Sequence, residues 1–150
     1  MTEMQQWLLL SYTLPREPSA PRVALWRKLK KLGAVLLHDA LWVLPATPAL
    51  EEQVRWLATE VAEADGSAEL WHGHLDHVTQ DASLVDLFVA QAEAGYQELL
   101  QLLDDPHVSR TELARRYRQI YAVDYFHAPS GERVRARLET QREGGETCSG

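Results

Sequence analysis

The sequence predicts an α+β protein in which a small sheet domain, covered by two helices, is followed by a segment that is helical throughout. Two observations predict this class. As far as residue 75, short apolar runs that are typical of strands alternate with amphipathic helical patterns. From residue 83 onward only the helical pattern recurs. At 150 residues, the chain is long enough to bury a core without metal or disulfide cross-links.

The first two elements are a strand and a basic helix. Residues Trp7–Leu14 form a mostly apolar run closed by Pro15, as expected for a central strand buried on both faces. From about Arg22 to Leu32, leucines repeat at four- and three-residue spacing while arginines and lysines occupy the other faces, which predicts an amphipathic helix. Gly33 is expected to end this helix.

Two short apolar runs after the helix predict a hairpin. The runs, at residues 34–38 and 41–45, are too short for helices, and the turn-prone pair Asp39-Ala40 separates them. Pro45 is expected to end the second of these strands, because proline cannot donate to a strand ladder.

A second helix and a fourth strand complete the sheet domain. Thr47 is a suitable cap and Pro48 a suitable first helical residue. Apolar residues then repeat at helical spacing at Leu50, Val54, Leu57 and Val61. Asp65-Gly66 ends the helix, and residues 67–75 resemble a strand. The resulting order, strand-helix-strand-strand-helix-strand, is that of the ferredoxin-like fold, βαββαβ, with two helices on one face of an antiparallel sheet.

The rest of the chain predicts three helices. A long one begins at about Ser83 and is broken at residues 104–106. Its apolar face is formed by Leu84, Phe88, Tyr96, Leu99 and Leu103. Ser109 and Glu112 fit a capping box for the next helix, whose inward residues are expected to be Leu113, Tyr117 and Ile120. The last helix, at about 132–142, has few apolar anchors, chiefly Val134 and Leu138.

We therefore expect three segments in the chain. Residues 1–78 form the ferredoxin-like domain, and residues 79–143 form an α-helical C-terminal extension packed on it. Residues 144–150 form a disordered tail.

The net charge of −7 is unevenly distributed. Residues 1–45 carry six basic and three acidic side chains, residues 46–105 carry one and thirteen, and residues 106–150 carry eight and six. Bulk charge therefore repels nucleic acid, and any binding to it must use local basic faces in the first and last thirds of the chain.

The composition argues against several classes of protein. The single cysteine, Cys148, cannot form an intramolecular disulfide, and the chain has no signal-peptide pattern or membrane-spanning apolar run. We expect a cytoplasmic protein that does not associate with membranes. The sequence contains no nucleophile elbow, phosphate-binding glycine loop, dinucleotide fingerprint or paired-cysteine site. We therefore expect no cofactor and no enzymatic activity.

Two groups of basic residues are candidate nucleic-acid contacts, because their side chains bind phosphates and release counterions. The first group, on the first helix, is Arg22, Arg27, Lys28, Lys30 and Lys31. The second group, on the helix that follows Ser109, is Arg115, Arg116 and Arg118. The last helix adds Arg133, Arg135 and Arg137. The alternative is that all these residues form solvated helix faces.

Three histidines are weak candidates for a metal site. Side chains two apart on a strand project to the same side, so His72, His74 and His77 are able to hold Zn²⁺ or Ni²⁺ if the strand end curls. No cysteine supports such a site, and the spacing matches no standard zinc pattern. A polar strand end is the preferred interpretation, and no metal is expected.

Asp124 and the five tryptophans complete the candidate residues. Asp124 follows an arginine-rich helix, so we expect it to face an arginine, in a structural role rather than the alternative catalytic one. The tryptophans occupy positions 7, 26, 42, 56 and 71, all on predicted elements of the sheet domain. Most are expected in the core or in a dimer interface, and a stacking platform for nucleotides requires exposed ones.

Four segments together resemble one known family. They are WLLLSYTLP at 7–15, Arg22 with WRKLKKLGA at 26–34 leading to LWVLP at 41–45, LFVAQAEAGYQEL at 87–99, and RRYRQIYAVDYF at 115–126. In this order and spacing they resemble the N-terminal domain of the ChrB chromate-resistance regulators. The resemblance implies a bacterial transcriptional regulator of its own resistance operon. Full-length members carry a second, C-terminal domain, which we expect to be absent from this protein.

The sheet domain also looks similar to a domain of PaaX-type repressors and to the small CRISPR adaptation nucleases. Those nucleases hold a divalent metal with an aspartate at the end of the first strand. The matching positions are Ser11-Tyr12-Thr13, which contain no carboxylate. Metal-dependent nuclease activity is therefore not expected.

Three functions remain to be separated. The first is a homodimeric, DNA-associated regulator that contacts phosphate through its basic helices. The second is an interaction module that does not bind DNA and docks on a separate sensor or C-terminal-domain protein, using the acidic middle of the chain. The third, an anion-binding or metal-dependent enzyme, requires the histidines or arginines to converge on a pocket.

Overall fold

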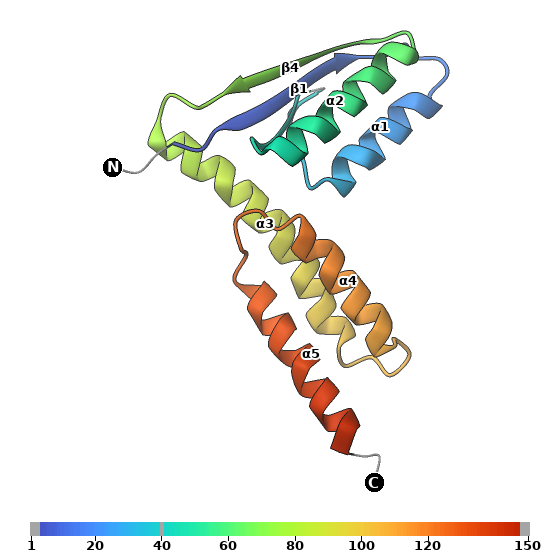
Figure 1. The fold of residues 1–150 in the computed structure, drawn as a ribbon, viewed down its shortest axis with the longest axis vertical. Helices are drawn as coiled ribbons and strands as arrows, with labels where there is room; N and C mark the ends of the chain where they lie inside the picture. The colour runs from blue at the N-terminus through green and yellow to red at the C-terminus, as the bar shows by residue number, and fades with distance from the viewer. Residues whose placement is uncertain (1–3, 40, 148–150) are drawn as a thin grey trace. The chain divides into compact units, whose positions relative to one another are not determined.

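The structure is a computed structural model that describes residues 4–39 and 41–147 (Figure 1). Over these residues the protein is mixed α+β, with a four-stranded sheet and five helices, so the predicted fold class is confirmed. The chain divides into two compact units, one up to Leu84 and the other from Val85.

The sheet of the first unit has the strand order expected of a ferredoxin-like domain. Its strands are β1 (Trp7–Thr13), β2 (Val35–His38), β3 (Leu41–Pro45) and β4 (Ser67–Gly73). They lie in the order β2-β3-β1-β4, and every neighbouring pair is antiparallel. The apolar run of β1 is central, as predicted, because it pairs with β3 on one side and β4 on the other.

Helices α1 (Ala20–Lys31) and α2 (Pro48–Glu63) lie side by side over one face of this sheet (Figure 1). Each helix turns its leucine or valine stripe inward, because these residues recur at three- and four-residue spacing. The buried residues are Leu25 and Leu29 in α1, and Leu50, Val54, Leu57 and Val61 in α2. The predicted core of both helices is confirmed.

The ends of these helices follow from local chemistry. The Oγ1 atom of Thr47 accepts a hydrogen bond from the backbone N–H of Leu50 at 3.2 Å, as expected of a cap. Gly33 has φ of 79°, a left-handed conformation that stops α1. The helix begins at Ala20 rather than at Arg22, because Pro21 fits its first turn. In the expected hairpin turn, Ala40 lies outside the described residues.

Gly66, between α2 and β4, permits a close approach of two backbone segments. A Cβ atom at this position would lie 2.3 Å from the carbonyl oxygen of Thr13, the last residue of β1. Only glycine therefore allows β4 to begin pairing where β1 ends.

Helix α3 (Val78–Leu102) begins earlier than predicted, because its first turn is held by contacts with a distant part of the chain. The Asp81 carboxylate accepts a hydrogen bond from the indole N–H of Trp7 at 2.8 Å and another from the backbone N–H of Gln5 at 3.1 Å. The boundary between the two units therefore falls inside α3.

The second unit packs the remainder of α3 with α4 (Arg110–Ala122) and α5 (Ser130–Thr147). Its buried cluster contains Ala92, Tyr96, Leu99, Leu103, Leu113, Ala128, Val134 and Leu138, with Tyr117 and Ile120 packed against it. The inward residues predicted for all three helices are confirmed.

Two polar contacts position the helices of this unit. Ser109 caps α4 by accepting from the backbone N–H of Glu112 at 3.1 Å. The start of α5 is held by Glu93 of α3, whose carboxylate accepts from both the backbone N–H and the hydroxyl of Ser130, at 2.6 and 2.7 Å. These bonds, led by the one from the backbone, lower the pKa of Glu93 below its usual value.

The last helix differs from the prediction at its C-terminal end. It runs to Thr147, so residues 144–147 are helical where a disordered tail was expected. The rest of that expected tail, including Cys148, lies outside the described residues. Across the part of the chain that the structure describes, no helix combines the length and the apolar character needed to cross a membrane.

Candidate nucleic-acid interface

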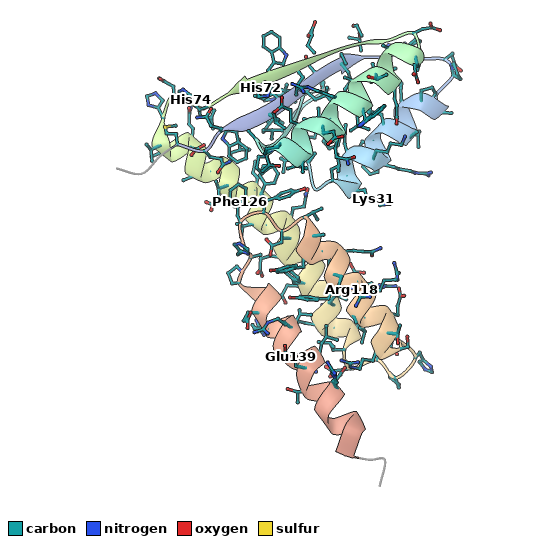
Figure 2. The ribbon with its side chains drawn as sticks, in the orientation of Figure 1. Lys31, His72, His74, Arg118, Phe126 and Glu139 are labelled. Atoms are coloured by element: carbon teal, nitrogen blue, oxygen red, sulfur yellow. The ribbon has the colours of Figure 1, made fainter. Side chains whose placement is uncertain are left out.

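The basic residues of α1 project away from the sheet. Because Leu25 and Leu29 take the inward positions, the side chains between and beside them point outward. Six of the exposed residues, which we call the basic face of α1, are Arg22, Val23, Trp26, Arg27, Lys30 and Lys31. Lys31 is labelled at the end of the helix in Figure 2. Five of the eight predicted contact residues lie on α1, and four of them belong to this face.

The fifth, Lys28, is directed elsewhere. Its Nζ atom lies 2.7 Å from Oε2 of Glu60 on α2, which turns it toward the neighbouring helix. Both side chains are about half exposed, at 50% and 44%, so the ion pair contributes little to stability. Lys28 is therefore a weaker candidate for phosphate contact than the rest of its group.

The other α1 cations remain available. Within the described residues, Arg22, Arg27 and Lys31 form no ion pair, and no acidic residue occurs in α1 itself. Lys30 lies over the indole ring of Trp26, with Nζ at 5.9 Å from the ring centroid. The basic face therefore presents uncompensated positive charge around an aromatic ring.

Trp26 lies on this exposed face, although most of the tryptophans were predicted to lie in the core or in a dimer interface. Its side chain is 49% exposed, whereas Trp7 and Trp42 are both 2% exposed. Trp56 and Trp71 are exposed as well, so most of the tryptophans do not lie in the core of the chain. The sequence contained one sign of this exposure: Trp26 lies one helical turn from both Arg22 and Lys30, and therefore on the same side of the helix as these two basic residues.

The arginines of α4 are largely compensated. Glu112 accepts hydrogen bonds from Nε of Arg115 and Nε of Arg116, both at 2.9 Å. These bonds, with that of Arg115 the larger, lower the pKa of Glu112 to about 2. The carboxylate is thus turned toward the arginines, and of the two bonds of a capping box only the Ser109 bond is formed. Arg118, labelled on α4 in Figure 2, is exposed and has no ion pair within the described residues.

Two of the three predicted arginines of α5 follow the same pattern, whereas Arg133 is exposed and forms no ion pair among the described residues. Arg135 is paired with Glu132 and with Glu139, the latter at 2.9 Å, and Arg137 lies 2.9 Å from Asp104. Four arginines of the second unit are therefore compensated by carboxylates of the same unit.

The three histidines are not brought together. His72 lies on the helix-covered side of the sheet, with Nε2 at 3.4 Å from a carboxylate oxygen of Glu51. Strand β4 ends at Gly73, so His74 no longer follows the strand alternation, and its Nδ1 lies 3.1 Å from the carbonyl oxygen of Leu75 (Figure 2). Among the residues described, no three His, Cys, Asp or Glu side chains gather in a way that would hold a metal ion.

Asp124 has a different partner from the one expected. It is buried, but it forms no ion pair with an arginine in the part of the chain that the structure describes. Its carboxylate accepts from the hydroxyl of Tyr96 at 2.9 Å and from the backbone N–H of Ala128 at 2.9 and 3.0 Å. The expectation of an arginine pair was wrong, because Tyr96 approaches from α3, a segment whose sequence pattern suggested only an apolar role.

Comparison with known proteins gives a consistent assignment. A family model described as "Protein ChrB, N-terminal" matches residues 22–119, which include most of α1 and most of α4. The chain is 32% identical over 145 residues to Protein ChrB from Cupriavidus metallidurans, and the aligned region covers 89% of this chain and 44% of that protein. The chain thus spans less than half the length of this relative. No solved structure matches it. The chain belongs to the ChrB family, and it matches the N-terminal part of that family's proteins.

Proposed function

We propose that the chain is a DNA-binding domain that regulates chromate resistance, and that the basic face of α1 contacts the phosphate backbone. The observation that carries this proposal is the set of exposed cations on α1 without carboxylate partners, namely Arg22, Arg27 and Lys31, beside the exposed ring of Trp26.

The dimensions of the face support contact with several phosphates. From Arg22 to Lys31 the helix rises by about 14 Å, which is about four nucleotide steps along one DNA strand. Cations without partners keep their counterion-releasing capacity, whereas an arginine that is already bound to a carboxylate has to exchange one ionic contact for another. The paired arginines of α4 are therefore secondary in this proposal, and Arg118 is their strongest member.

The test is a fluorescence-anisotropy titration of the whole chain with a duplex from the promoter of its own operon, at several salt concentrations. Binding that weakens linearly on a logarithmic scale of salt supports phosphate contact. A scrambled duplex of the same length separates base recognition from general affinity. Absence of binding at low salt, or binding that salt leaves unchanged, would overturn the proposal.

A second candidate function is docking on a separate protein without DNA contact. It is favoured by the outer side of α2, where Trp56 is 63% exposed and acidic side chains, including Glu52 and Glu63, are exposed around it. An aromatic residue among carboxylates is suited to a basic partner surface. Copurification of one defined partner that is lost on Trp56→Ala, with DNA binding absent in the unmodified chain, would favour this function.

The proposal also takes the protein to be a cytoplasmic homodimer, since regulators that read operator DNA are commonly two-fold symmetric. Light scattering coupled to gel filtration measures the mass of the species in solution. A mass equal to one chain at the concentrations used for DNA binding would contradict the dimer.

A further inference from the structure

The second unit contains a pocket that is unrelated to the basic face of α1. It lies between the end of α4 and the start of α5 and has a volume of about 460 Å³. This volume falls within the range of small-molecule sites and exceeds what a bare ion needs. The residues that define its chemistry are Tyr96, Tyr117, Tyr121, Asp124, Glu132 and Arg135.

One wall of the pocket is aromatic. Tyr117 and Tyr121, one turn apart on α4, are stacked with ring centroids 5.8 Å apart and planes inclined by 29°. The ring of Tyr96 lies 6.1 Å from that of Tyr117. Tyr121 is 55% exposed, so its ring is accessible from solvent. The three rings thus form one aromatic cluster in the pocket wall, and the faces of such rings are electron-rich.

The position of Tyr96 is fixed from two sides. Its hydroxyl donates to the buried carboxylate of Asp124 at 2.9 Å. On the other side, a Cβ atom at Gly131 would lie 2.9 Å from Cζ of Tyr96, so α5 approaches this ring as closely as it does only because glycine is present. His127, which also lines the pocket, has φ of 54°, an uncommon conformation for a residue other than glycine. The pocket is thus preformed by packing and hydrogen bonding.

The charges around the pocket favour a cation. Asp124 and Glu132 contribute two carboxyl groups. The single arginine of the wall, Arg135, is held by Glu132 and by Glu139. That ion pair lowers the pKa of Glu132, which keeps its carboxyl group ionised at neutral pH. A guanidinium held between two carboxylates has little capacity left for an anionic ligand.

We propose that this pocket binds an organic cation, through the faces of Tyr117 and Tyr121 and the negative charge of Asp124 and Glu132. Ammonium and guanidinium groups are attracted to aromatic faces within about 6 Å of the ring centroid, and adjacent carboxylates strengthen the attraction. The same arrangement disfavours oxyanions, chromate included. The cationic group is carried either by a free small molecule or by a lysine or arginine side chain of another protein.

The test is an NMR titration of the whole chain, labelled with ¹³C in its tyrosine rings. The probes are tetramethylammonium chloride, the side-chain mimic Nα-acetyl-lysine amide, and sodium sulfate, with the ionic strength held constant by sodium chloride. We expect saturable shifts of Tyr117 and Tyr121 with the two cations and none with sulfate. Tyr12, in the first unit, serves as an internal reference.

Two variants and one matched control assign the shifts to the pocket. Tyr121→Ala, at an exposed position, and Glu132→Gln should each weaken cation binding by about fivefold. Glu112→Gln removes another exposed, arginine-paired carboxylate of the same unit, outside the pocket, and should leave the affinity unchanged. Tighter binding of tetramethylammonium identifies a free small cation as the ligand, and tighter binding of the lysine mimic identifies a protein side chain.

Three results would overturn the proposal: no saturable shift with either cation in the millimolar range, saturable binding of sulfate at these tyrosines, or equal loss of affinity in Glu112→Gln and Glu132→Gln. None of these results bears on DNA binding, which is measured separately through α1.

Discussion

In α1 and in α4, basic side chains occupy comparable exposed positions, and the two helices differ in where the nearest carboxylates lie. Helix α1 contains no acidic residue, and among the described residues the one carboxylate that forms an ion pair with an α1 cation, that of Glu60, comes from α2. In α4, Glu112 lies three and four residues before Arg115 and Arg116 and pairs with both.

The two helices therefore differ in whether their basic side chains are paired with a carboxylate or are available to an external partner. An arginine with a glutamate at helical spacing contributes to the local order of its own helix, since such pairs are neighbours on the helix surface. A cation without such a neighbour keeps its charge for an external partner. A count of arginines and lysines therefore overestimates how many cations of the second unit are available to bind phosphate. The same count does not show that the cations of α1 differ in having few carboxylate partners.

The largest effect is expected from breaking the buried polar contact of the second unit. Asp124→Ala leaves the hydroxyl of Tyr96 and the backbone N–H of Ala128 without their acceptor, which should lower the free energy of unfolding of this unit by about 3 kcal/mol. All five tryptophans lie in the first unit, so urea unfolding should be followed by tyrosine NMR or helical circular dichroism.

The matched control is Asp86→Ala, because Asp86 is an exposed aspartate of the same unit. It should change the free energy of unfolding by less than about 0.5 kcal/mol. Equal effects of the two substitutions would show that the Tyr96–Asp124 contact contributes nothing specific to stability.

The next effect concerns DNA binding by the unpaired cations. Replacing Arg22, Arg27 and Lys31 together by alanine should reduce the slope of log affinity against log salt by about 3 units, because roughly 0.9 counterion is released for each phosphate contact. Anisotropy titration at several salt concentrations measures this slope. All three side chains are exposed, so the fold should be retained.

The paired arginines supply the control for this experiment. The double substitution Arg115→Ala and Arg116→Ala removes a similar charge from α4, where Glu112 already compensates it. Its slope should fall by clearly less than that of the α1 variant. Equal losses from both variants would abolish the distinction between the two helices.

A smaller effect is expected on acid stability. The pKa of Glu112 is lowered from 4.5 to about 2 by its bonds to Arg115 and Arg116. Because the folded-state pKa is the lower one, the stabilising contribution is complete above about pH 4.5 and is lost as the pH falls toward 2. Glu112→Gln should therefore flatten the pH dependence of unfolding in this window, as followed by circular dichroism. Glu98→Gln, at an exposed site of α3, should leave the dependence unchanged.

The smallest effect is the release of the compensated arginines. Glu112→Gln frees Arg115 and Arg116, so DNA affinity at low salt should rise, by no more than about threefold, because exposed ion pairs are weak. Anisotropy titration of this variant beside the unmodified chain measures the change. A decrease in affinity would show that Glu112 positions the two arginines for DNA and does not withhold them from it.

Several parts of the structure were predictable because their signals are local. The caps at Thr47 and Ser109 and the stop at Gly33 depend on residues within one helical turn. The buried faces of α2 and α3 follow from helical periodicity, and the strand order follows from the sequence of elements together with the rule for split βαβ units.

The sites were predictable only in part. The basic residues of α1 could be identified, because a helix that buries two leucines must expose the residues between them. The ion pairs of Arg115 and Arg116 with Glu112 were also predictable, because Glu112 lies three and four residues before them. The capping-box pattern instead predicted that the Glu112 carboxylate would accept a hydrogen bond from the backbone. The aromatic pocket could not be found from the sequence, since its tyrosines lie on two helices and two of them, Tyr96 and Tyr117, were predicted only as inward-facing residues.

The sequence by itself determined the order, the caps and the buried faces of the elements, and with them the basic side of α1. Tertiary structure decided the start of α3, where Asp81 receives the indole N–H of Trp7, and the partner of Asp124, which is Tyr96. The physical reason is range. Periodicity and capping act between residues a few positions apart, whereas these hydrogen bonds join residues 74 and 28 positions apart, which only the packed fold brings within 3 Å.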